Sequence, residues 1–153
     1  MTATARRFAR DRMIRFGDCD PAGIVFFPQY LVMFVGLIED FVGEALGISY
    51  AQLIGRRRVG LPTVSLSCEF RHPSAMGDRV SLGLSVLRVG RSSVGLALDC
   101  RDADGERERV AVRQTIVATS LETHRPISLP ADLRAALEEF EPALRPGATE
   151  TRH

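Results

Sequence analysis

The longest apolar segment of the chain lies in its first third, where Leu31 opens a run of apolar residues with helical rather than alternating spacing. Pro28 fits the start of a helix, where its missing N–H costs nothing, and Gly47 fits the end. We therefore predict a helix over residues 28–46. Its apolar residues cover most of the circumference, which indicates a helix buried on more than one side.

Further along the chain, apolar and polar residues alternate, as is typical of strands with one buried face. We predict four such strands and expect all of them to contribute to the core. Their apolar positions are Val64, Leu66, Cys68 and Phe70, followed by those of segments 80–86, 94–100 and 110–119. The Asp104-Gly105 pair between the last two segments is the clearest hairpin turn.

A first strand over 8–16, a short helix over 49–54 and a C-terminal helix over 130–141 complete the predicted elements. Their order, without repeats or a linker, favours an α+β protein in which an antiparallel five-stranded sheet wraps around one long helix. We expect residues 1–142 to form this single domain. Residues 143–153 are expected to be a disordered tail.

Composition narrows the class of protein further. Hydrophobic residues make up 45% of the 153 residues and charged residues 25%, which are ordinary globular values. A net charge of +1 argues against nucleic-acid binding, and no apolar run approaches the ~20 residues of a membrane span. Cys19, Cys68 and Cys100 have no metal-like spacing and suggest free thiols in a reducing cytosol. We therefore expect a cytoplasmic protein that binds no nucleic acid, membrane, metal or cofactor.

The candidate chemistry is concentrated in the stretch FGDCDPAGIVFFPQY, residues 16–30. Asp18 and Asp20 lie in a turn-prone run directly before the predicted helix. The amides of Phe27, Gln29 and Tyr30 are expected to be free and to point back toward these acids. Because a helix N-terminus carries partial positive charge and unpaired N–H groups, it can hold an oxyanion. A carboxylate beside such a site is the arrangement that acyl transfer needs.

This stretch resembles the signature of the hotdog-fold thioesterases, specifically the 4-hydroxybenzoyl-CoA thioesterase branch, and the resemblance extends over residues 13–119. It implies that Asp20 is the catalytic carboxylate and that the Phe27 amide is the oxyanion donor. It also assigns Gly23 and Pro28 to the substrate-binding site. Asp20 acts either as a nucleophile or as a general base, and Asp18 is interpreted as a loop-stabilising acid.

A CoA substrate brings phosphates, which need cations or free amides. Arg88 and Arg91 flank the turn at Gly90, where members of the resembled family place basic CoA contacts, and Ser92 adds a hydroxyl. The basic run 56–58 is a second candidate. We predict that Arg88, Arg91 and Ser92 contact CoA.

The acyl pocket departs from the resembled branch at one position. The branch carries a carboxylate where this chain has Val35, and the neighbouring Phe34 and Ile38 are also apolar. A buried hydroxyl without a partner costs ~1–3 kcal/mol. The sequence therefore predicts a plain aromatic or medium-chain acyl group without a para hydroxyl.

Taken together, these residues predict an acyl-CoA thioesterase that forms a homodimer or homotetramer, with sheets paired edge to edge and the active site at the dimer interface, as the resemblance implies. A first alternative is hydrolysis of acyl carrier protein thioesters, with the basic run 56–58 receiving the acidic partner. A second is a non-catalytic acyl-CoA-binding protein, which would be favoured if Asp20 were remote from any helix N-terminus.

Overall fold

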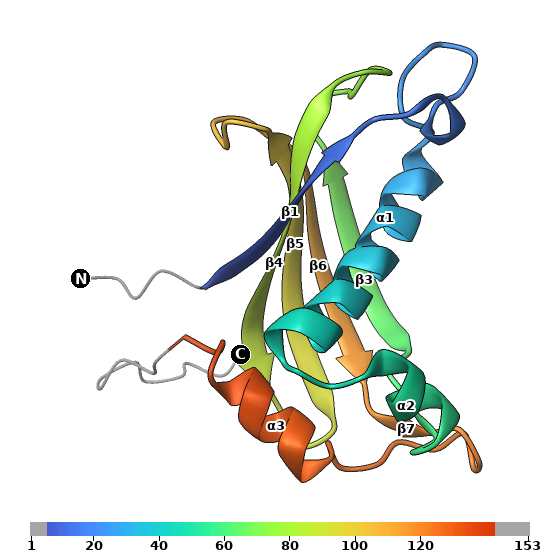
Figure 1. Cartoon of the computed structure of the whole chain (residues 1–153), viewed down its shortest axis with the longest axis vertical. Helices are drawn as coiled ribbons and strands as arrows, with labels where there is room; N and C mark the ends of the chain where they lie inside the picture. Colours follow the sequence, from blue (N-terminus) through green and yellow to red (C-terminus); the bar gives the residue numbers. More distant parts are fainter. Residues whose placement is uncertain (1–5, 143–153) are drawn as a thin grey trace, which may run out of the picture.

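A five-stranded antiparallel sheet forms one layer of the molecule, and the helix α1 lies across one of its faces (Figure 1). The computed structural model describes residues 6–142, so the predicted tail lies outside the described residues. The strands follow the spatial order β1 (Arg7–Met13), β4 (Arg79–Val89), β5 (Ser93–Asp102), β6 (Glu108–Val117) and β3 (Thr63–Phe70). This arrangement confirms the predicted α+β hotdog fold.

The central helix is close to its predicted bounds. α1 (Phe27–Asp40) begins one residue before Pro28 and continues as a π-helical segment, η2 (Phe41–Ala45). Gly47 follows at a φ of +69°, a backbone conformation that favours glycine, and the helix ends there as predicted. At the other end of the same region, β1 stops at Met13 rather than residue 16, because a short 3₁₀ helix, η1 (Phe16–Asp18), begins the loop before α1.

The core lies between the sheet and one face of the helix. On the helix side, Met33, Phe34, Leu37 and Ile38 are buried. The sheet contributes the alternating apolar positions of its three central strands: Val80, Leu82, Leu84, Val86, Val94, Leu96, Leu98, Cys100, Val110, Val112 and Ile116. Burial of each large aliphatic or aromatic side chain contributes about 1.5–3 kcal/mol, so this layer dominates the stability of the fold.

The first predicted core strand, β3, is not buried. Val64, Leu66 and Phe70 are 61%, 41% and 52% exposed, because β3 is an edge strand that pairs only with β6. The expectation that α1 is buried on more than one side is also wrong for the single chain, since Val32 and Val35 are 62% and 65% exposed.

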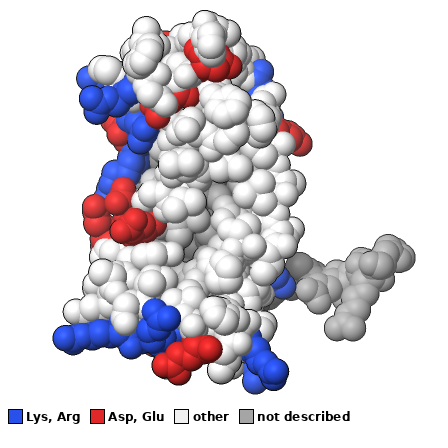
Figure 2. All heavy atoms as spheres, turned by 90° about the vertical axis from the view of Figure 1, so that its right-hand side faces the viewer, with Lys and Arg blue, Asp and Glu red and all other residues white. Residues whose placement is uncertain are grey.

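These five exposed apolar side chains, here called the β3–α1 face, belong to α1 and β3, which lie on one side of the molecule (Figure 1). Figure 2 views that side and shows a broad area almost free of charged side chains, with Lys, Arg, Asp and Glu gathered at its margins. An apolar surface of this kind marks an interaction site more often than a solvated surface.

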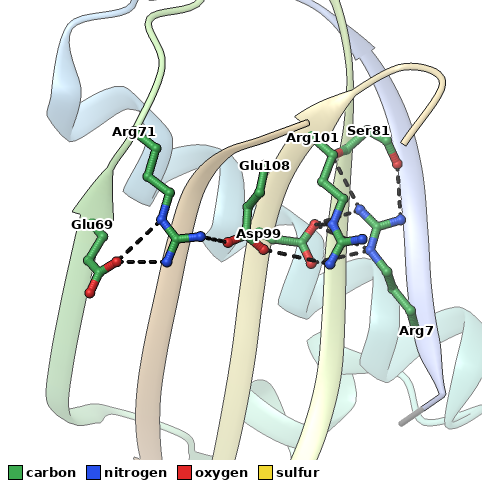
Figure 3. Close-up of polar contacts among 7 residues, drawn as sticks. All are labelled: Arg7, Glu69, Arg71, Ser81, Asp99, Arg101 and Glu108. Atoms are coloured by element: carbon green, nitrogen blue, oxygen red, sulfur yellow. Dashed lines mark hydrogen bonds and ion pairs between the residues drawn. The ribbon is translucent and has the colours of Figure 1, made fainter. Parts of the chain in front are cut away.

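Among residues 6–142, no helix covers the face of the sheet that points away from α1, and a row of ion pairs crosses this face (Figure 3). Arg71 contacts Glu108 at 2.5 Å, and Asp99 contacts Arg7 at 2.6 Å and Arg101 at 3.4 Å. Partly exposed pairs of this kind contribute little stability, typically ~0–1 kcal/mol each. Their main consequence is that this face is electrically neutral along the row.

Shorter elements close the end of the fold opposite the start of α1. α2 (Tyr50–Gly55) is capped by the Ser49 hydroxyl, which accepts from the Gln52 amide at 3.2 Å. The two-residue strands β2 (Val59–Gly60) and β7 (Thr119–Ser120) pair with each other and were not predicted, because two residues carry no periodicity. α3 (Ala131–Glu138) is shorter than the predicted 130–141. Within residues 6–142, no helix is both long and apolar enough to cross a membrane.

Candidate active site

Asp20 opens a tight turn inside residues 16–26, here called the acid loop. The Gly23 amide donates to the Asp20 carbonyl at 2.9 Å, and the Ala22 amide donates to the Asp20 carboxylate at 2.8 Å. Gly23 closes the turn at a φ of +79°, which a side chain would strain. The conformation of the turn therefore accounts for a glycine at position 23. The turn holds the Asp20 carboxylate at the loop surface.

Asp18 has a different role, because it is buried and fully engaged. Its carboxylate accepts from the Arg12 guanidinium at 3.0 Å and from the Arg15 amide at 2.9 Å. Its carbonyl accepts from the Phe26 amide at 3.0 Å, which ties the acid loop to the residue before α1. Asp18 thus stabilises the loop, as the sequence predicted.

The start of α1 offers fewer free amides than predicted. The Gln29 amide donates to the Phe26 carbonyl at 2.8 Å, so the expectation of a free N–H there is wrong. Pro28 has no N–H to offer. The Phe27 amide opens the helix and forms no hydrogen bond with any other described residue. It remains the donor best placed at the positive end of the helix dipole.

An aromatic cavity of about 300 Å³ lies at the start of α1. Phe27, Tyr30 and Phe70 supply its aromatic walls, and the Phe70 ring centroid lies 6.0 Å from that of Phe27 and 6.1 Å from that of Tyr30. The remaining lining residues are Ile24, Val25, Arg71, His72 and Pro73. The Arg71 guanidinium is neutralised by Glu69 and Glu108. The cavity therefore suits a flat apolar group better than an anion.

Sequence reasoning missed the part that β3 plays in this cavity. Phe70 was expected in the core because it follows the alternation of its strand. It lies at the end of an edge strand instead, where its ring meets two side chains from α1. No local pattern in the sequence predicts this contact between β3 and α1. Asp20 lies in the adjoining loop and is not among the lining residues.

The predicted apolar wall around Val35 is not formed. Phe34 and Ile38 are buried in the core at 2% and 8% exposure, whereas Val35 is 65% exposed on the β3–α1 face. Val35 lies about 100° around the helix from Phe34, which turns its side chain away from the core that Phe34 enters. The argument against a para-hydroxyl substrate consequently has no support within the single chain.

The predicted CoA contacts lie at the opposite end of the sheet. Asp78 hydrogen-bonds to Ile14 beside the acid loop, and β4 then extends from Arg79 to Val89, a span of roughly 33 Å. Arg88, Arg91 and Ser92 lie at the far end of that strand and in the turn that follows it (Figure 1). Within one chain, the structure does not bring them near Asp20.

This turn is held in place by α3. Arg134 donates to the carbonyls of Gly90 and Arg91 at 2.8 and 2.7 Å, while the Arg91 side chain donates to the Ser128 hydroxyl at 3.1 Å. In the basic run 56–58, which lies at this same end, Arg57 is paired with Asp132 at 2.7 Å. Arg88 and Arg91 remain exposed, so both candidate phosphate sites stay accessible.

Cys19 does not provide a competing nucleophile. Its pKa is raised by desolvation and by the negative charges of Asp18 and Asp20 on either side. The thiol, which is the weaker nucleophile, is therefore the prevailing form near neutral pH. Among the side chains of the acid loop, this leaves the Asp20 carboxylate as the group best suited to acyl transfer.

The sheet, the central helix and the loop at its start define a hotdog-fold domain with a candidate thioester site at the helix N-terminus. The model of the thioesterase-like superfamily matches residues 14–137. The chain belongs to this family and is a hotdog-fold thioesterase.

Three relatives show the range of named activities. A 1,4-dihydroxy-2-naphthoyl-CoA hydrolase from Synechococcus elongatus is 35% identical over 106 residues, covering 69% of this chain and 75% of the relative. A 4-hydroxybenzoyl-CoA thioesterase from Pseudomonas is 31% identical over 90 residues, covering 58% and 64%. A solved gentisyl-coenzyme A thioesterase superposes with a TM-score of 0.76 at 25% identity, covering 85% of this chain and 99% of that one.

Proposed function

We propose that this thioesterase hydrolyses an aromatic acyl-CoA to the free acid and CoA in the cytoplasm. The observation that carries the proposal is the cavity of about 300 Å³ at the start of α1, with three aromatic side chains in its walls. Offset and edge-to-face contacts favour an aromatic ring there over a flexible aliphatic chain. The three named relatives, whose substrates are all aromatic acyl-CoA esters, support the same class.

In the proposed reaction, the thioester carbonyl lies between the Asp20 carboxylate and the Phe27 amide. The amide stabilises the negative charge that develops on the carbonyl oxygen, and one such donor is typically worth ~3–4 kcal/mol of barrier. Asp20 then takes one of two routes. It attacks the carbonyl, expels the CoA thiolate and forms an anhydride that water hydrolyses, or it removes a proton from the attacking water.

A homodimer built through the β3–α1 face completes the proposal. β3 offers an unpaired edge with exposed Val64 and Leu66, whereas the other edge strand, β1, carries the charged residues Arg7, Arg10 and Arg12. Edge strands rich in charge resist pairing, whereas β3 carries Glu69 as its one charged residue and exposes apolar side chains, which favours pairing. A two-fold axis at β3 would pair this strand with its own copy in the antiparallel direction.

The geometry of that pairing bears directly on the site. β3 runs from Thr63, near the turn that holds Arg91, to Phe70 at the aromatic cavity. An antiparallel copy therefore brings its own Arg91 turn alongside the aromatic cavity of the first chain. The dimer would then join two sets of residues that lie at opposite ends of one chain.

The direct test is a thiol-release assay across benzoyl-, 4-hydroxybenzoyl-, 1,4-dihydroxy-2-naphthoyl- and hexanoyl-CoA. We expect the best aromatic ester to exceed hexanoyl-CoA by at least about tenfold in kcat/KM, which corresponds to ~1.4 kcal/mol of transition-state binding. Hexanoyl-CoA as the best substrate would contradict the aromatic assignment. The two benzoyl esters test the earlier expectation, based on Val35, that a para hydroxyl is disfavoured.

A further inference from the structure

Beneath the acid loop, the charged side chain of Arg109 is buried on β6. Its guanidinium donates to Asp102 at 2.6 Å, to Asp78 at 2.8 Å and to the Ser74 hydroxyl at 3.2 Å. The pKa of Asp102 is lowered chiefly by its bond to Arg109, and that of Asp78 by the Ala75 amide and then by Arg109. Both carboxylates are therefore held in the ionised form that the arginine requires.

Ser74 connects this arginine to the candidate active site. It is fully buried, and its hydroxyl also contacts the Tyr30 hydroxyl at 2.9 Å. Its carbonyl accepts from the Val25 amide at 2.9 Å. Tyr30 belongs to the first turn of α1 and lines the aromatic cavity, while Val25 belongs to the acid loop. One buried serine thus contacts both parts of the site.

The backbone reinforces the same connection. Residues 71–78, which link β3 to β4, are anchored at their start by two amides, those of Arg71 and His72, that donate to the Arg109 carbonyl at 2.8 and 3.1 Å. The Met76 amide donates to the Gly23 carbonyl at 3.1 Å, inside the Asp20 turn. Both the side chain and the carbonyl of Arg109 therefore support the loop on which the Asp20 turn rests.

The energetics of these contacts indicate that they fix the relative placement of the surrounding elements more than they stabilise the fold. Burying the Arg109 guanidinium carries a desolvation cost that its attraction to two partly exposed carboxylates often only balances. A hydrogen-bonded network around a buried charged group does, however, define one geometry among its members. Here the members span β5, β6, the 71–78 loop, the acid loop and α1, which are the elements whose relative placement sets the distance between Asp20 and the Phe27 amide.

We propose that Tyr30 and Ser74, anchored by Arg109, are positioning residues that hold the start of α1 in register with the Asp20 turn during thioester hydrolysis. The inference rests on the proposed function for its kinetic consequence. Neither hydroxyl takes part in the chemical step. Each acts by fixing the Phe27 amide and the Asp20 carboxylate at the separation the reaction needs.

The kinetic test compares Tyr30→Phe and Ser74→Ala with Tyr50→Phe, which alters the only other tyrosine, half-buried in α2. A small displacement of reacting groups costs far more rate than binding, so we expect Tyr30→Phe and Ser74→Ala each to lower kcat about tenfold with KM changed less than about twofold. The double variant should be no slower than Ser74→Ala alone, because Ser74→Ala already removes the bond between Tyr30 and Ser74. Tyr50→Phe should match the unaltered protein.

A purely structural role would lower the melting temperature and leave kcat intact at temperatures where the variants remain folded. A kcat for Tyr30→Phe equal to that of Tyr50→Phe would therefore overturn the proposal while Asp20-dependent hydrolysis, and with it the proposed function, remained.

Hydrogen exchange supplies a second readout that needs no substrate. The Val25 and Phe26 amides are bonded to Ser74 and Asp18, so their exchange reports the register of the acid loop. We expect faster exchange at both amides in Tyr30→Phe and unchanged exchange in Tyr50→Phe. Equal protection in the two variants would overturn the proposal. If the unaltered protein hydrolyses none of the esters, the proposed function fails and this comparison alone judges the positioning role.

Discussion

The two ends of the sheet differ in almost every property that matters for a thioesterase. At one end, here called the acid-loop end, an ordered turn, a helix N-terminus and an aromatic cavity meet above the buried Arg109. At the other, the turn end, Arg88 and Arg91 are exposed, and the turn that carries Arg91 is fixed by Arg134. The first end holds the residues proposed for the chemical step, and the second holds the cations proposed to contact a phosphate.

A strand of roughly 33 Å separates these ends. The residues of both ends of one chain therefore cannot all lie next to the same thioester carbonyl. The comparison teaches that the rate of the chemical step and the affinity for CoA should depend on different ends. It also implies that the β3–α1 face matters for activity. A second copy bound at this face would place its turn end beside the acid-loop end of the first chain. Each of these consequences can be tested separately.

The largest effect is expected from Asp20→Asn at the acid-loop end. The amide can still accept the Ala22 hydrogen bond but can act as neither nucleophile nor base, so kcat should fall by about 10²–10⁴-fold with fold and oligomer intact. Steady-state kinetics with the best ester, together with circular dichroism and light scattering, measure this.

Asp104→Asn is the matched control for that variant. The Asp104 carboxylate accepts from the Glu106 amide at 3.0 Å, two residues on, which is the same local arrangement as Asp20 with Ala22. It lies in the exposed β5–β6 hairpin, and its kcat should equal that of the unaltered protein. Turnover within about threefold of the unaltered protein in Asp20→Asn would show that Asp20 is not the catalyst, and Asp18 would then be tested.

The next effect is expected from Leu66→Arg, which places a charge in the middle of the β3–α1 face. If a second copy covers β3, the buried charge should disrupt the dimer and lower kcat/KM by at least about tenfold. Asp11→Arg introduces the same side chain on the exposed side of the other edge strand and should change neither property. Light scattering that finds the unaltered protein monomeric at micromolar concentration would rule out the dimer.

The smallest effect is expected from the turn end. Replacing both Arg88 and Arg91 with Ala removes contacts made equally in the ground and transition states, so KM should rise by about tenfold while kcat stays constant. The matched variant is Arg56→Ala with Arg58→Ala, which removes two cations from the same end of the molecule. Should KM rise only in this second variant, the phosphate site lies in the basic run 56–58.

The sequence was informative wherever a local pattern has one physical solution. Pro28 and Gly47 mark the bounds of the central helix to within a few residues, since each restricts the backbone conformation at its own position. The Asp104-Gly105 hairpin is confirmed for the same reason, with Gly105 at a φ of +80°. The stretch from residue 16 to residue 30 identified the family through its order of residues, and the family model confirms that identification.

Burial on an edge was beyond the reach of the sequence. The alternation in β3 is the same as that in β4 and β5, yet Leu66 is 41% exposed and Leu84 and Leu98 are 1% exposed. Alternation reports which positions share a face, and strand order decides whether anything covers that face. The same limit explains why Phe70 was expected in the core.

By itself, then, the sequence determined the main elements and the acid loop before α1, because these depend on residues close together in the chain. The order of those elements, with the family resemblance, indicated the fold class. Only the tertiary structure decided that Phe70 joins Tyr30 in one cavity and that Arg88 lies at the far end of the sheet. It alone placed Arg109 beneath Tyr30, through Ser74. These relations depend on strand order and on contacts between residues far apart in the chain, such as Tyr30 with Ser74, 44 positions away, which no local pattern encodes.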